Sequence, residues 1–138
     1  SFTYKGMMVS DVPNMSNTTG YTNASWTLKA DLINAYVCRL LNKMDKSKQD
    51  YCVARVNNPD MASEFSLDFS SGYVQRSVHL LPKQGNKNPW RLFQNYFLDF
   101  LFLKTGSLQD DAMNFHRAGE FFATQKDDEQ DNAEALVS

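Results

Sequence analysis

The sequence has little cysteine and no long apolar run. Cys38 and Cys52 are the only cysteines in 138 residues, too few for a disulfide framework and without the spacing of a metal site. Cys38 falls inside a predicted helix, where we expect a small buried side chain. The most apolar stretch, 96–103 (YFLDFLFL), is far shorter than the roughly 20 residues that cross a membrane, and it carries Asp99. The composition gives no sign of a disulfide-stapled domain or of a membrane span.

Catalytic and nucleotide-binding motifs are missing as well. The chain contains no GxGxxG, no P-loop and no GxSxG. His79 and His116 stand far apart, without a Cys or Glu at ligand spacing, so we expect ordinary histidines and no metal site. Asp110 and Asp111 are adjacent, which does not turn two carboxylates toward each other on a helix, and a solvated loop is the simpler interpretation.

Charge is nearly balanced, with 14 Lys and Arg against 16 Asp and Glu. This balance argues against nucleic-acid binding as the main task. A small basic cluster of Lys83, Lys87 and Arg91 is able to hold a phosphate, but a solvated surface explains it equally well and is favoured. The last residues, 116–138, are acidic and are predicted to form a disordered tail.

Three Asn-x-Ser/Thr sequons begin at Asn14, Asn17 and Asn23. They would accept glycans in a secreted protein. Because no signal peptide is visible and the cysteines are unpaired, we interpret them as polar turns. A glycosylated secreted domain is an alternative hypothesis, and it would require an upstream signal peptide.

Hydrophobic periodicity predicts an α+β fold dominated by two helices, with short strands near the N-terminus. The first helix is expected over about 25–44 and the second over about 89–104. Asn88 is the expected N-cap of the second helix, Pro89 its first residue, and Gly106 a left-handed stop. The predicted inner face of the first helix consists of Trp26, Ala30, Ile33, Val37, Leu40, Leu41 and Met44.

Shorter elements are expected elsewhere. Residues 2–9 predict one strand or two short ones, 15–19 a further short strand, and 51–56 a β-prone run. Residues 72–81 have the spacing of a short helix, and 110–115 suggest a single helical turn.

The segment 20–32, GYTNASWTLKADL, contains the start of the first helix and could be either a ligand site or an ordinary helix cap. The start of a helix carries unpaired N–H groups and a partial positive charge, which suits an anion or a carbonyl. Gly20 would allow a close approach to the backbone. However, Thr22, Asn23 and Ser25 are also ordinary N-cap types, and capping explains these residues without a ligand.

Five strings, taken in order, resemble one family: YKGMMVSDVPNM, GYTNASWTLKADL, YVCRLLNKMD, GYVQRSVHLLPKQGNKNPWRLFQNYFLDF and DDAMNF. Together they are similar to the C-terminal end of flavin-dependent monooxygenases of the Baeyer–Villiger type, in the group of the ethionamide-activating enzymes. The resemblance runs from about Thr3 to Phe115. It implies that 1–44 closes an FAD domain and that 51–115 forms a C-terminal helical extension.

The resemblance implies an α/β enzyme with two dinucleotide-binding domains, one for FAD and one for NADPH. In such cytoplasmic enzymes NADPH reduces the flavin, O₂ adds to give a peroxyflavin, and one oxygen atom enters a ketone or is placed on the sulfur of a thioether or thioamide. The first helix would then point its start at the pyrimidine end of the flavin, where negative charge collects. The residues expected near the flavin are Gly20, Thr22, Asn23, Ala24, Ser25 and Trp26.

Both glycine-rich fingerprints of that family are missing, so we expect this chain to need the remainder of the enzyme for activity and to contain no catalytic residue. The face formed by Phe97, Phe100 and Leu101 would be exposed without that remainder. It is expected to meet the rest of the enzyme or, peripherally, a membrane surface. The competing hypothesis is a stand-alone, non-catalytic helical interaction module that uses the same face.

Overall fold

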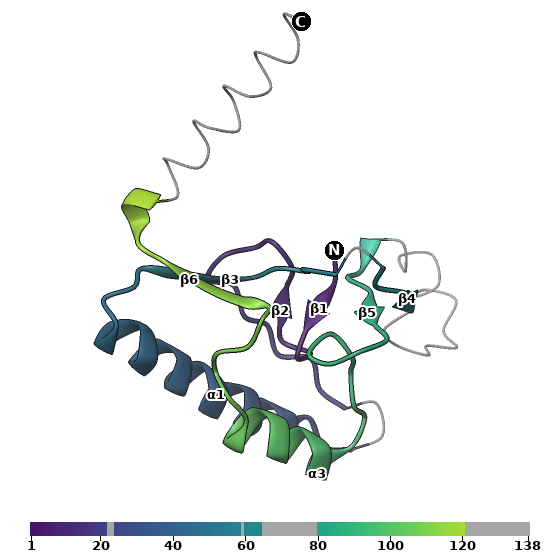
Figure 1. Cartoon of the computed structure of the whole chain (residues 1–138). Helices are drawn as coiled ribbons and strands as arrows, with labels where there is room; N and C mark the ends of the chain where they lie inside the picture. Colours follow the sequence, from purple (N-terminus) through teal and green to yellow (C-terminus); the bar gives the residue numbers. More distant parts are fainter. Residues whose placement is uncertain (22–23, 59, 65–79, 121–138) are drawn as a thin grey trace, which may run out of the picture.

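In the computed structural model, short strands lie over two helices that run side by side (Figure 1). The model describes residues 1–21, 24–58, 60–64 and 80–120. The α+β character predicted from the sequence is confirmed. In chain order the elements are β1 (Thr3–Tyr4), β2 (Met8–Val9), α1 (Trp26–Lys46), β3 (Tyr51–Ala54), β4 (Ser63–Glu64), β5 (Gln84–Gly85), α3 (Tyr96–Asp99), η2 (Phe100–Thr105) and β6 (Met113–His116).

Helix α1 confirms the first predicted helix, and Ser25 is its N-cap residue. The predicted inner face is partly wrong, because Trp26 and Leu41 are exposed at 61% and 58%. The helix is rotated so that Lys29 and Tyr36 turn inward, where partners on distant elements meet them. The buried residues of α1 are Lys29, Leu32, Ile33, Tyr36, Leu40 and Met44. Cys38 is exposed on this helix, so its predicted burial is wrong, while Cys52 is buried.

The second helix begins later than predicted. Asn95, rather than Asn88, is its N-cap, and the Asn95 side chain accepts hydrogen bonds from the main-chain N–H groups of Phe97 and Leu98. The loop before it is held by Trp90, which is buried and meets the ring of Tyr4 edge-on at 5.6 Å. Residues 88–90 form a turn in which the Trp90 N–H donates to the Lys87 carbonyl at 2.9 Å, and 91–95 continue as a loop. The predicted helix over 89–95 is therefore wrong.

The end of the second helix also differs from expectation. Its last six residues form the π-helix η2. Gly106 follows with φ −67° and ψ 158°, so the predicted left-handed stop is wrong. Instead the Arg39 guanidinium of α1 donates hydrogen bonds to the carbonyls of Leu103, Lys104 and Gly106 at 3.0, 2.7 and 2.8 Å. A side chain from the neighbouring helix thus satisfies the carbonyls that end η2.

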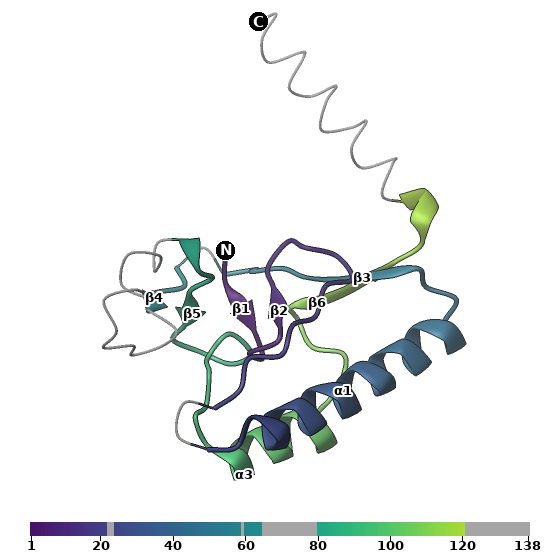
Figure 2. The same ribbon diagram turned by 180° about the vertical axis from the view of Figure 1, so that it is seen from behind.

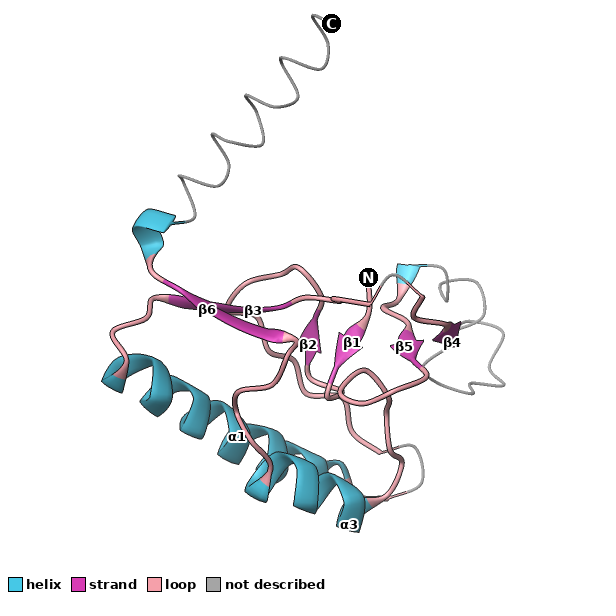
Figure 3. Cartoon of the chain, in the orientation of Figure 1, coloured by secondary structure: helices cyan, strands magenta, loops and turns pink. Residues whose placement is uncertain are grey.

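The strands form three antiparallel pairs, β1–β2, β3–β6 and β4–β5 (Figure 3). The predicted pair within 2–9 is confirmed as the β1–β2 hairpin, with its turn at Lys5 and Gly6 (φ 48° and 71°). The β-prone run at 51–56 supplies β3. Its partner β6 replaces the helical turn predicted over 110–115, which is wrong because those residues pair with a strand about 60 positions earlier in the chain.

Residues 15–19 form an exposed loop, so the strand predicted there is also wrong. Hydrogen bonds of Asn14 and Asn17 hold this loop to the strands. The Asn14 side chain accepts from the Cys52 N–H at 3.0 Å and donates to the Asp50 carbonyl at 3.1 Å. The Asn17 N–H reaches the Met7 carbonyl at 2.7 Å. Most of the helix predicted over 72–81, with His79, lies outside the described residues.

The core lies between α1, the second helix and the strands, as both faces of the molecule show (Figures 1 and 2). Its largest fully buried side chains are Tyr4, Met7, Ile33, Tyr36 and Leu103. In the described part of the chain, no helix has the length and hydropathy that a membrane span needs.

Candidate functional site

Of the residues expected near a flavin, four are described. Gly20 is buried, whereas Ala24, Ser25 and Trp26 are exposed around the start of α1. Thr22 and Asn23 lie outside the described residues. The structure brings Gly20 against the indole of Trp26, where a Cβ on residue 20 would overlap the ring. The close approach that Gly20 permits is therefore made by the chain's own Trp26.

The described residues at the start of α1, Ala24, Ser25 and Trp26, are exposed. The Ser25 side chain does not cap the helix, since its Oγ pairs with the Thr27 hydroxyl at 2.7 Å. The first turn also carries no acidic residue. The N–H groups of a first turn have no partner within the helix and carry partial positive charge. This end of α1 thus presents donors beside an exposed indole.

Behind the start of α1 lies a buried group that we call the Asp99 clamp: Tyr21, Lys29 and Asp99. The Lys29 ammonium and one Asp99 carboxylate oxygen are 2.6 Å apart, and the Tyr21 hydroxyl donates to the same oxygen at 2.7 Å. Both charged side chains are nearly inaccessible, at 5% and 7% exposure. Burial, together with the Asp99 carboxylate, raises the pKa of Tyr21. The clamp ties the first turn of α1 and the segment at Gly20 to the second helix.

A second polar group, the Asp110 network, joins Tyr4, Lys5, Tyr36 and Asp110. The Tyr4 hydroxyl donates to Asp110 at 2.8 Å and lies 3.2 Å from the Tyr36 hydroxyl. The Lys5 ammonium reaches Asp110 at 3.2 Å, Tyr36 at 3.4 Å and the Ser107 carbonyl at 3.2 Å. Burial lowers the pKa of Lys5, raises that of Tyr4, and raises that of Tyr36 to about 12.

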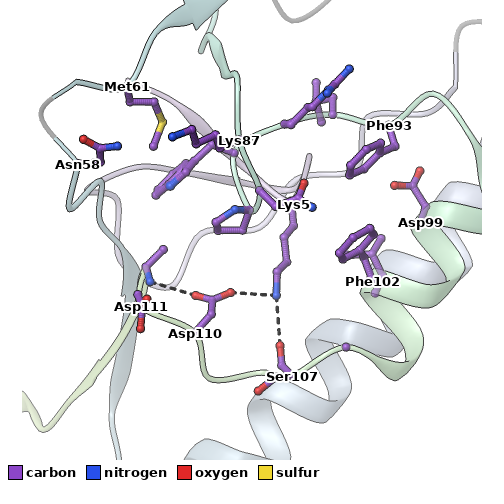
Figure 4. A pocket seen from close by; sticks show the side chains of 18 of the residues that line it. Lys5, Asn58, Met61, Lys87, Phe93, Asp99, Phe102, Ser107, Asp110 and Asp111 are labelled. Carbon is purple, nitrogen blue, oxygen red and sulfur yellow. Dashed lines mark hydrogen bonds and ion pairs between the residues drawn. The ribbon is translucent and has the colours of Figure 1, made fainter.

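One member of the clamp and two of the network line a pocket of about 590 Å³ (Figure 4). Asp99 lines it on one side and Lys5 with Asp110 on another, and Figure 4 shows Phe93 and Phe102 beside Asp99. Its volume is within the range of small-molecule sites. Two members of the predicted basic cluster, Lys87 and Arg91, also line it. Lys83, the third member, does not, since its main chain pairs with Phe2 beside β1.

The sequence interpretation missed this pocket and both polar groups. It left Lys29 out of the inner face of the first helix and placed Asp110 in a solvated loop, because no local pattern marks a partner 70 or 106 residues away. The one available signal was Asp99, a charge inside the most apolar run. Among the described residues, no three His, Cys, Asp or Glu side chains gather as a metal site would require.

Comparison with known proteins gives several relatives. The chain is 50% identical over 112 residues to the FAD-containing monooxygenase EthA of Mycobacterium tuberculosis, which covers 81% of the chain and 23% of that protein. It is 43% identical over 124 residues to the probable FAD-binding monooxygenase AlmA of an Acinetobacter species, covering 89% of the chain and 25% of the relative. The putative FAD-containing monooxygenase MymA of M. tuberculosis is 40% identical over 124 residues. No protein-family model and no solved structure matches. The chain spans about a quarter of the length of these relatives.

Proposed function

Because the chain is related to a segment of the FAD-containing monooxygenases, we propose that it forms the C-terminal part of a cytoplasmic FAD- and NADPH-dependent enzyme. That enzyme inserts one oxygen atom from O₂ into a ketone or places it on the sulfur of a thioether or thioamide. Residues 1–44 would close the FAD domain of a two-dinucleotide-domain enzyme, and 51–115 would extend it. The relationship to the named monooxygenases is the observation that carries this proposal.

The residues present fit one end of a flavin. The pyrimidine end of a reduced flavin carries negative charge, and the start of α1 offers N–H donors that the Ser25 side chain does not cap, with no acidic residue in the first turn. Trp26 offers an exposed indole at the same place. The residues that would face FAD are Gly20, Thr22, Asn23, Ala24, Ser25 and Trp26. They do not include a glycine-rich loop for the pyrophosphate, which other parts of such an enzyme would supply.

When bound, FAD supplies the redox chemistry and the activation of O₂. The task of this chain is to orient and stabilise. The first turn of α1 would place donors where negative charge develops, and preorganised donors of this kind would need no rearrangement during the reaction. The Asp99 clamp fixes that turn through Lys29 and fixes the preceding segment through Tyr21.

The remainder of the enzyme chain is the partner that we propose for the exposed apolar face of the second helix. Phe97 and Leu101 are 77% and 57% exposed, and Trp26 lies at the start of the adjacent helix α1. The relatives are about four times as long as the matched segment. One alternative is that this face makes a peripheral contact with a membrane surface. Another is that the chain is a stand-alone interaction module that binds a partner through this face.

The experiment that tests the function uses the intact protein in which this chain occurs. We expect it to purify with FAD and to consume NADPH and O₂ when a ketone or thioether is added. A protein that purifies without flavin and leaves NADPH unchanged with both substrate types would contradict the proposal. A sharp, cooperative thermal melt of the isolated 138 residues would instead favour the stand-alone module.

A further inference from the structure

We propose that the pocket between the Asp99 clamp and the Asp110 network binds an apolar, ring-sized ligand that carries one anionic group. This inference rests on the pocket's own residues and does not depend on the proposed flavin chemistry. It assigns the body of the ligand to aromatic walls and its anionic group to Lys87 and Arg91.

The walls suit a flat apolar body. Phe93 and Phe102 are stacked with ring centroids 5.3 Å apart and planes within 2° of parallel, and both line the pocket. Trp90 and Leu103, which also line it, are buried in the core. One wall comes from the π-helix η2, and π-helical turns occur often at functional sites. A volume of about 590 Å³ accommodates a small aromatic molecule.

Two of the acidic groups in the lining are already neutralised. Asp99 pairs with Lys29 and accepts from Tyr21. Asp110 pairs with Lys5 and also accepts from the main-chain N–H groups of Ala112 and Met113. The Lys5 ammonium, with three acceptors around it, has no proton left for a ligand. Neither of these two ion pairs therefore determines the charge of the ligand.

The remaining charges favour an anion. Within the described part of the chain, Lys87 and Arg91 make no ion pair, and the Arg91 guanidinium lies 5.8 Å from the centre of the Phe93 ring. Among the described residues that line the pocket, Asp111 is the one acidic residue whose carboxylate makes no ion pair. It is exposed and lies beside Asp110 (Figure 4). Arg and Lys together bind carboxylate, sulfonate or phosphate oxygens through charge-assisted hydrogen bonds.

The test compares two probes with the same naphthalene body and opposite charge, 2-naphthalenesulfonate and 2-naphthylmethylammonium. Their affinities are measured by titration calorimetry on the intact protein, with the double variant Lys87→Ala/Arg91→Ala and with Lys83→Ala as the matched control. Lys83 belongs to the same basic cluster but does not line the pocket. A third variant, Phe102→Ala, removes part of the aromatic wall, and a thermal melt verifies that each variant is folded.

We expect the sulfonate to bind at least about tenfold more tightly than the ammonium probe, because charge-assisted hydrogen bonds give this preference. The double variant should lose that preference, Lys83→Ala should keep it, and Phe102→Ala should weaken both probes. The proposal is overturned if the sulfonate does not bind the intact protein, if the ammonium probe binds as tightly, or if Lys83→Ala and the double variant behave alike. Flavin content is recorded on the same samples, so failure here and failure of the proposed function remain distinguishable.

Discussion

At the scale of single residues, the molecule depends on a few charges placed where the chain excludes water. Lys29 and Asp99 are the clearest case, since both are buried and each is the other's only ionic partner within the described residues. Removing one charge of a buried pair leaves the other desolvated, which costs more than the pair itself contributes. The free energy of unfolding should therefore fall more when one charge of the Lys29–Asp99 pair is removed than when both are removed together.

Asp99→Asn tests the clamp. It keeps the shape of the side chain and removes the charge, so we expect a loss of about 3–5 kcal/mol in the free energy of unfolding, measured with urea. The double variant Lys29→Met/Asp99→Leu should cost less than Asp99→Asn, because it leaves no buried charge. Asp111→Asn, at an exposed carboxylate, should stay within about 0.5 kcal/mol of wild type. Equal losses for Asp99→Asn and Asp111→Asn would show that the pair is not buried as described.

Gly20→Ala tests the close contact at the start of α1. The added Cβ would overlap the Trp26 ring, so the ring or the backbone must move, at a cost of about 1–3 kcal/mol. In the intact protein we also expect weaker flavin retention. Gly119→Ala is the matched control, because open space surrounds that position. If both variants unfold at the same urea concentration, the contact between Gly20 and Trp26 has no energetic weight.

Tyr36 predicts a pH dependence. Burial raises its pKa from 10.0 to about 12, so the folded state favours the protonated hydroxyl. Its contribution to stability is complete below pH 10 and is lost as the pH rises through about 12. Urea unfolding at a series of alkaline pH values should show a smaller loss of stability in Tyr36→Phe than in wild type. Parallel pH profiles for the two proteins would refute this assignment.

At the scale of elements, the two helices are joined at both ends, by the Asp99 clamp at their starts and by Arg39 at the end of η2. Hydrogen bonds from a charged donor to main-chain carbonyls are stronger than neutral ones. Arg39 therefore decides where the second helix stops, a task that the sequence pattern had assigned to Gly106.

Arg39→Met should lower the free energy of unfolding by about 1–2 kcal/mol, since three carbonyls lose a charged donor that is itself partly exposed. Amide hydrogen exchange over 103–107 should become faster at the same time. Lys43→Met, one turn further along α1, removes an exposed hydrogen bond to Gln109 and a cation–π contact with the Phe115 ring, so it should cost less than Arg39→Met and leave exchange over 103–107 unchanged. Unchanged exchange over 103–107 in Arg39→Met would contradict the capping role.

The sequence predicted the elements that are set by neighbouring residues and missed those that are set by contacts distant in the sequence. The length of α1 and the β1–β2 hairpin depend on nearby residues, and both were predicted. The rotation of α1 depends on Asp99, and β6 depends on pairing with β3, so neither leaves a local trace. The start of the second helix was predicted at Asn88, whereas the N-cap is Asn95, and the burial of Trp90 in the intervening loop leaves no local trace in the sequence.

Of the two parts of the candidate site, the start of α1 could be predicted from the sequence and the pocket could not. The start of α1 was located because capping residues and periodicity mark it, and a resemblance over most of the chain indicated flavin as its ligand. The pocket brings together residues from both ends of the described chain, Lys5 and Asp110 among them. Lys87 and Arg91 were noticed as a cluster, but only the folded chain shows that they share a cavity with aromatic walls. A pocket of this kind can be recognised only from the three-dimensional structure.

At the scale of the whole molecule, we propose that this chain is one part of a larger flavoenzyme. The relatives are about four times as long, and the apolar side chains of Trp26, Phe97 and Leu101 face outward. Exposed apolar surface of this kind marks an interface. The central claim is that the start of α1 meets FAD within that assembly.

Hydrogen–deuterium exchange on the intact protein, with FAD bound and after its removal, tests this claim most directly. The account predicts slower exchange with FAD in the peptide covering 24–32, because the first-turn amides of α1 would gain an acceptor, and no change in the peptide covering β6. Equal exchange over 24–32 in the two states, in a protein that demonstrably binds FAD, would contradict the account.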